Sequence, residues 1–135
     1  MGNKLGYHKI GFETMQEYIS QKVLIINTLD STKQDCLIAG TILYQEEEGY
    51  VNSLLYGDKK ENIILYGMNC LDESVIKKAE QLIELGFTNI FIYVGGLFEW
   101  LLLKDIYGEE NFPTIGDELE LLKFKPITTR LLMER

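Results

Sequence analysis

The stretch Asn62-Ile-Ile-Leu-Tyr66-Gly67-Met-Asn-Cys70-Leu-Asp-Glu73 runs from an apolar segment into a loop that contains one of the two cysteines of the chain. Residues 63–66 are short and almost wholly apolar, which is typical of a strand covered on both faces of a parallel sheet. The loop leads into a helix that Asp72 or Ser74 can cap. The sequence therefore predicts a strand, a loop and a helix N-terminus around Cys70.

The segment after the loop has the spacing of an amphipathic helix followed by a second strand. The apolar residues of this helix recur at three- and four-residue intervals: Val75, Ile76, Ala79, Leu82 and Ile83. Gly86 can end the helix in a left-handed conformation, and residues 90–94 form a second apolar run. A strand, a crossover helix and a strand of this length predict a right-handed parallel unit.

Length and charge limit the classes of protein that fit. A chain of 135 residues is long enough for one domain with its own core, so we expect residues 1–135 to be a single domain. The net charge of −8 argues against nucleic acid or an anionic membrane surface as a partner. The apolar runs are too short for a membrane span. The absence of an apolar signal region predicts a cytoplasmic protein with reduced thiols.

The residues that bind metals are too few and badly spaced for a metal site. Cys36 and Cys70 are the only cysteines, and His8 is the only histidine. We therefore expect no metal and no cofactor. Cys36 is expected to be a small packing residue rather than a reactive thiol.

The rest of the chain continues the alternation of strands and helices. Residues 7–10 and 23–26 have strand patterns. Helices are expected over residues 12–19, 46–55 and 97–108, with a short final helix over residues 116–122. This order predicts an α/β fold with a mainly parallel central sheet and helices on both faces.

Two motifs resemble those of the rhodanese (sulfurtransferase) family: Gly86-Phe87-Thr88-Asn89-Ile90-Phe91 and Gly95-Gly96-Leu97-Phe98-Glu99-Trp100. The chain is similar to a single-domain rhodanese over about residues 12–114. The resemblance implies a three-layer rhodanese-like domain. It also implies an enzyme that stores sulfane sulfur as a cysteine persulfide in the loop after the central strand.

The loop of residues 67–73 departs from the pattern of that family. Counted from the strand, Gly67 stands at the position of the nucleophile; counted back from Gly86, Asn69 does, one residue before Cys70. We take Cys70 as the candidate catalytic residue. The other residues of the loop are the candidate substrate-binding residues: Gly67, Met68, Asn69, Leu71, Asp72 and Glu73.

The loop contains features that favour an anionic sulfur and features that disfavour it. A helix N-terminus favours a thiolate and supplies N–H donors to an anionic sulfur. Nearby Asp72 and Glu73 disfavour both the thiolate and an anionic donor such as thiosulfate, and residues 68–75 contain neither Arg nor Lys. A phosphatase loop of the Cys-x5-Arg type is excluded, because Ile76 follows Cys70 at the arginine position.

Two functions remain open. The first is sulfane-sulfur transfer through a persulfide on Cys70, from a small sulfur donor to a thiol or cyanide acceptor. The second is a catalytically inactive rhodanese-like binding or regulatory module with a protein partner. Backbone N–H groups that converge on the Cys70 sulfur would favour the enzyme, and a buried Cys70 or a loop folded over the pocket would favour the module.

The ends of the chain carry weak signals. Met1-Gly2-Asn3 is compatible with N-myristoylation, but Gly6 stands where serine or threonine is preferred. Residues 127–135 have no counterpart in the resemblance and are expected to be a loosely attached tail.

Overall fold

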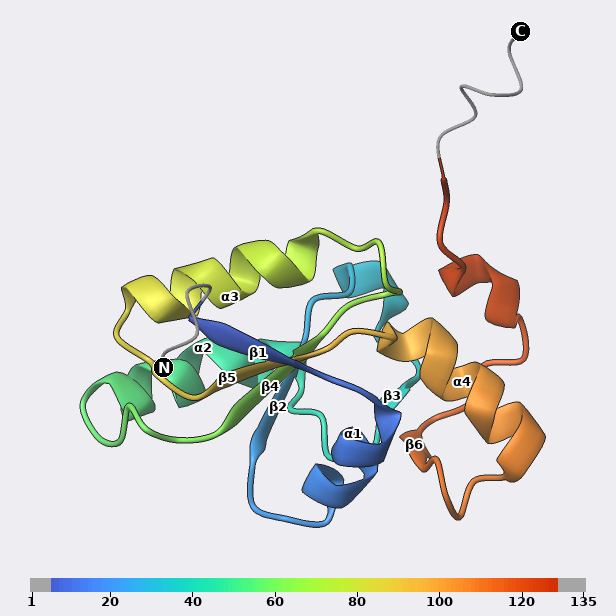
Figure 1. Ribbon diagram of the computed structural model, residues 1–135, viewed down its shortest axis with the longest axis horizontal. Coiled ribbons are helices and arrows are strands. Elements are labelled where there is room, and N and C mark those ends of the chain that lie inside the picture. The colour runs from blue at the N-terminus through green and yellow to red at the C-terminus, as the bar shows by residue number, and fades with distance from the viewer. Residues whose placement is uncertain (1–5, 129–135) are drawn as a thin grey trace, which may run out of the picture.

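Four parallel strands form the central sheet in the order β1-β5-β4-β2 (Figure 1). They are β1 (Tyr7–Ile10), β2 (Leu24–Asn27), β4 (Ile63–Tyr66) and β5 (Ile90–Tyr93). Every side chain of β2 and β4 is buried, because helices cover both faces of the sheet. The mainly parallel α/β architecture expected from the sequence is confirmed.

The computed structural model describes residues 6–128. Gly2 and its possible myristoylation lie outside the described residues, as does the expected tail beyond residue 128.

Two pairs of helices make the outer layers. Helices α2 (Tyr44–Leu55) and α3 (Ser74–Glu84) cover one face of the sheet, and α1 (Phe12–Ile19) and α4 (Gly96–Tyr107) pack on the other. The first face buries Ile63 and Leu65 of β4, and the second buries Ile64 and Tyr66 of the same strand, as strand alternation requires. None of the helices between residues 6 and 128 has the length and apolar character needed to cross a bilayer.

The β4–α3–β5 unit agrees with the sequence prediction. Helix α3 spans Ser74–Glu84 and buries Val75, Ala79 and Leu82 against the sheet. Gly86 has a φ of +103°, and the N–H of Phe87 returns to the Leu82 carbonyl, which is the arrangement of a left-handed helix C-terminus. Strands β4 and β5 then pair in parallel, from Ile63 opposite Ile90 to Leu65 opposite Ile92.

The predicted helix over residues 116–122 is wrong. The chain instead forms a short strand, β6 (Thr114–Ile115), a turn, and the 3-10 helix η2 (Leu121–Phe124). Gly116 has a φ of +80°, and the Glu118 carboxylate accepts the N–H of Glu120. These local bonds compete with the bonds of an α-helix, and so short a segment cannot recover the cost of helix nucleation.

A small second sheet ties this C-terminal region to the middle of the chain. Strand β3 (Leu37–Ile38) pairs antiparallel with β6, and Ala39 donates to the Pro113 carbonyl. A second 3-10 helix, η1 (Ser31–Lys33), precedes β3. Strand β3 lies inside the segment of residues 36–42, and neither β3 nor its partner β6 was predicted.

Candidate functional site

The candidate loop, residues 67–73, lies where β4 ends and helices α3 and α4 begin. Leu97 and Phe98 of α4 donate to the carbonyls of Gly67 and Met68 at 3.0 and 2.9 Å. Gly96 makes this contact possible, because its φ is +69° and a Cβ there would lie 2.8 Å from the Gly67 carbonyl oxygen. The Gly95-Gly96 motif therefore fixes the first half of the loop.

The Asp72 carboxylate accepts one N–H group of the loop and one N–H group at the start of α3. One oxygen accepts the Met68 N–H at 2.7 Å. The other oxygen accepts the Ser74 N–H at 3.0 Å and lies 2.6 Å from the Ser74 hydroxyl. Asp72, one of the two residues expected to cap α3, therefore satisfies the first N–H of that helix, and it also holds the Met68 N–H, which an external anion could otherwise use.

Asn69 is the residue that stands at the nucleophile position when the count runs back from Gly86. Its side chain is 7% exposed. The side-chain oxygen accepts the Leu71 N–H at 2.9 Å, and the side-chain nitrogen donates to the Phe124 carbonyl at 2.9 Å. A buried amide bonded at both ends stabilises the loop but offers no nucleophile.

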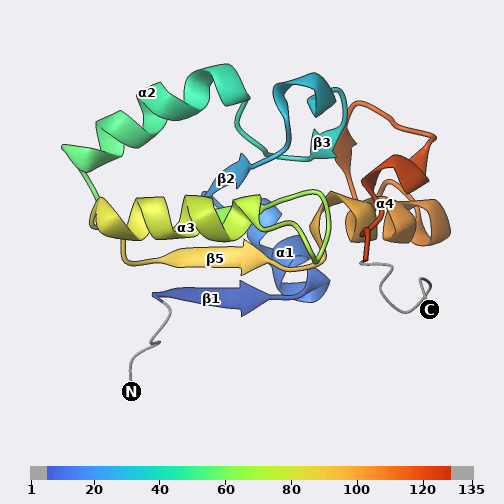
Figure 2. The same cartoon turned by 90° about the horizontal axis from the view of Figure 1, so that it is seen from above.

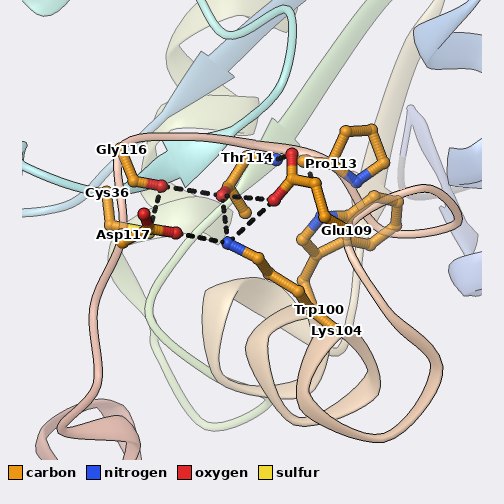
Figure 3. A network of polar contacts seen from close by, with 8 residues as sticks. All are labelled: Cys36, Trp100, Lys104, Glu109, Pro113, Thr114, Gly116 and Asp117. Atoms are coloured by element: carbon orange, nitrogen blue, oxygen red, sulfur yellow. Dashed lines mark hydrogen bonds and ion pairs between the residues drawn. The ribbon is translucent and has the colours of Figure 1, made fainter.

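The C-terminal segment that reaches Asn69 is anchored on α4 by a polar network (Figure 3). Lys104 contacts Asp117 at 2.8 Å, Glu109 at 2.9 Å and the Thr114 hydroxyl at 2.7 Å, while the Trp100 indole donates to the Pro113 carbonyl at 3.0 Å. Burial alone would lower the pKa of Lys104, but its bonds to Asp117 and Glu109 raise it. The ammonium group therefore remains a fixed cation at the centre of this network.

The two cysteines lie in opposite environments. Cys70 is exposed, and within residues 6–128 no backbone N–H donates to its sulfur. Cys36 is buried beside Gly116, 3.7 Å from that carbonyl, and burial raises the pKa of its thiol. Cys36 is thus a packing residue, as expected. In the described part of the chain, no three His, Cys, Asp or Glu side chains gather to hold a metal ion.

A shallow hollow of about 400 Å³ lies over the loop. It is lined by most of the expected loop residues and by two residues from the C-terminal segment: Met68, Asn69, Leu71, Asp72, Glu73, Ser74, Lys125 and Ile127. Gly67 and Cys70 do not line it. Sequence reasoning missed Lys125 and Ile127, since no element was expected over residues 123–126 and residues 127–135 had no counterpart in the resemblance.

Comparisons with known proteins agree with this architecture. No protein-family model matches the sequence, and no curated protein gives a significant match. Among solved structures, the rhodanese-like domain of the Alr3790 protein from Anabaena is similar, at 23% identity and a TM-score of 0.59. The match covers 90% of this chain and 86% of that one. The chain has a rhodanese-like fold.

Proteins named for different activities share this rhodanese-like fold. Ygr203w, a yeast protein tyrosine phosphatase of the rhodanese family, is 14% identical with a TM-score of 0.57, covering 86% of this chain and 96% of that one. A thiosulfate sulfurtransferase from Pseudomonas aeruginosa is 17% identical with a TM-score of 0.56, covering 71% of this chain and 19% of that one. At such identities the likeness shows the fold alone, and the activity must be argued from the site.

Proposed function

We propose that this rhodanese-like domain is a binding module whose loop of residues 67–73 does not transfer sulfur. The observation that carries the proposal is the internal use of the polar groups of the loop. The Asp72 carboxylate accepts the N–H groups of Met68 and Ser74, and the Asn69 amide bonds to the Phe124 carbonyl. An incoming sulfur anion would have to displace these partners.

A persulfide enzyme requires N–H donors that are free to bond to its sulfur. Its sulfur is negatively charged and needs N–H donors that point toward it. Here the thiol of Cys70 is exposed, the N–H groups of Leu71 and Asp72 that follow it are bonded to Asn69, and the nearby Asp72 carboxylate would repel an anion. The closed loop therefore supports a role in binding rather than in catalysis.

The hollow over the loop is the surface that we expect a protein partner to contact. Its rim includes two apolar side chains, Leu71 and Ile127, which are 51% and 82% exposed. Charges of both signs lie beside them, on Asp72, Glu73 and Lys125. A mixture of apolar and charged groups is typical of a modest protein-binding surface.

Sulfane-sulfur transfer through Cys70 is the second candidate function. It is favoured by one observation, the exposure of the thiol at the carboxyl edge of the parallel sheet. This edge is where open α/β sheets usually bind ligands. A small sulfur donor could reach the thiol without any change in the fold.

The test is a sulfur-transfer assay on reduced protein, with thiosulfate as donor and cyanide as acceptor. Wild type, Cys70→Ser and Cys36→Ser are compared, and intact mass is recorded for a gained sulfur atom. We expect no thiocyanate above the uncatalysed rate and no sulfur adduct on any of the three proteins.

One pattern of results would contradict the binding-module proposal. If wild type and Cys36→Ser release sulfite, gain one sulfur and form thiocyanate while Cys70→Ser does not, Cys70 is a nucleophile and the binding-module proposal fails. Repeating the assay with glutathione persulfide as donor separates a general lack of reactivity from a failure to accept the thiosulfate dianion.

A further inference from the structure

A second hollow lies away from the loop, between α2 and α3. Both helices cover the same face of the sheet, but α2 tilts away from α3 (Figure 2). The hollow measures about 590 Å³, and its lining shares no residue with the loop of residues 67–73. Binding of a ligand in this hollow would therefore not depend on the chemistry of Cys70.

Helix α2 is only lightly packed on the sheet. Of its twelve residues, Val51 alone is buried. One ion pair, from Glu47 to Lys78 of α3, spans the hollow. A helix usually covers an apolar stripe by packing against a neighbour, and α2 leaves much of its side facing α3 uncovered.

Both polar and apolar side chains line the groove. Val51, Leu82 and Leu29 line its interior, and Leu85 lies along the α3 wall. The rim adds apolar surface that is open to solvent, since Tyr44 is 44% exposed and Leu85 is 39% exposed. An open groove between two helices, with apolar contacts along it, suits the apolar face of a peptide segment.

The charged side chains on α2 and α3 determine which kind of peptide the groove favours. Helix α2 contains three glutamates and no Lys or Arg, whereas α3 carries two lysines and two glutamates. Glu47 is neutralised by Lys78, but Glu48 lines the groove without an ion pair to any residue in the described range 6–128. The groove is therefore acidic along one wall, which favours a basic segment.

We propose that the groove between α2 and α3 binds a basic amphipathic peptide segment of a partner protein. The apolar side chains of the segment pack on Tyr44 and Leu85, above the buried Val51 and Leu82, and its lysine or arginine side chains meet Glu48 on α2. The partner is a protein segment with positive charge, which complements the acidic wall.

The test uses the whole protein and a fluorescently labelled synthetic peptide in which leucines recur at helical spacing among lysines and alanines. Binding is measured by fluorescence anisotropy, and the contact surface is mapped by changes in backbone amide NMR shifts. We expect saturable binding, weakened by added salt, with the largest shift changes at Val51, Leu82 and their neighbours. A peptide with glutamate in place of lysine should not bind.

Three variants locate the site. Glu48→Lys reverses a charge that lines the groove and should weaken binding on the order of tenfold. Glu17→Lys makes the same change on α1, on the opposite face of the sheet, and should have little effect. Asn52→Trp fills the groove without changing its charge and should also weaken binding.

Several results would overturn the proposal. Equal weakening by Glu48→Lys and Glu17→Lys would mean that the peptide responds only to the net charge of the protein. Shift changes confined to another surface would place the binding elsewhere. Absence of saturable binding would show that the groove does not bind such a peptide. Equal binding of the acidic peptide would show that the charge of the groove does not determine binding.

Discussion

The side chain of Asn69 donates a 2.9 Å hydrogen bond to the carbonyl of Phe124, a residue 55 positions later in the chain. Phe124 is itself buried, at 1% exposure, in the core formed with α1 and α4. The bond therefore fastens the loop after β4 to a part of the chain that is already packed. It makes the closed form of the loop part of the folded core.

Removing this bond should destabilise the protein measurably. Asn69→Ala leaves the Phe124 carbonyl and the Leu71 N–H without their partners, which costs about 1–3 kcal/mol for a buried polar group. Urea denaturation of both proteins measures the loss. Asn52→Ala, at an exposed position on α2, is the matched control and should change stability by less than about 0.5 kcal/mol. Equal effects of the two changes would mean that Asn69 does not hold the loop closed.

Gly96 should tolerate no side chain. Alanine there must adopt a φ of +69° and place a Cβ 2.8 Å from both the Gly67 carbonyl oxygen and the Asn69 nitrogen. The left-handed conformation alone costs about 1–2 kcal/mol, and the contact adds to it. Gly49→Ala in α2 meets nothing within 4 Å and should stabilise by about 0.5–1 kcal/mol. Thermal denaturation of the two variants should therefore shift in opposite directions.

The two thiols should differ sharply in reactivity. Cys70 is exposed, whereas Cys36 is buried and burial raises the pKa of its thiol. A chromogenic disulfide reagent should modify one thiol rapidly in the folded protein and two in denaturant. Cys70→Ser should abolish the rapid reaction, and Cys36→Ser should leave it unchanged. Rapid modification of Cys36 in the folded protein would contradict its burial.

Two tyrosines should resist ionisation while the protein is folded. Burial raises the pKa of Tyr66, and burial together with the Glu99 carboxylate raises the pKa of Tyr93, both from an ordinary value of 10.0. A raised folded-state pKa contributes stability that is complete below pH 10 and is lost as pH rises above it. Ultraviolet titration of the phenolate should show at least two of the eight tyrosines silent until unfolding.

Tyr93→Phe provides the control for this effect. The variant lacks one of the two protected phenols, so its free energy of unfolding should fall less steeply with pH in the alkaline range. Identical slopes for wild type and variant would show that Tyr93 titrates normally.

The parts of the fold that depend on local pattern were predictable from the sequence. The apolar run at residues 63–66, the spacing in α3 and the position of Gly86 define the β4–α3–β5 unit, because each follows from side-chain periodicity or from a required backbone conformation. The Gly95-Gly96 motif was identified through its resemblance to the rhodanese family. The assignment of Cys36 as a packing residue followed from the general tendency of free cysteine to be buried.

The closed loop could not be predicted, because it depends on contacts between distant residues. Nothing in the local sequence places Phe124 beside Asn69 or pairs β6 with β3. The prediction of a helix over residues 116–122 failed for a related reason. The leucines and glutamates of this segment have helical spacing, but Gly116 and Glu118 form a turn. The loop residues were identified correctly as a group, but their hydrogen bonds depend on the C-terminal segment.

The strand order carries a consequence for the synthesis of the chain on the ribosome. Strand β1 is the first to be made, and it pairs in the sheet only with β5, Tyr7 lying opposite Ile90. It has no hydrogen-bonded neighbour in the described sheet until β5 has been translated, and closing so long a loop slows folding. During that interval the nascent chain presents an unpaired strand, so within the central sheet the pairing of β2 with β4 can precede the pairing of β1.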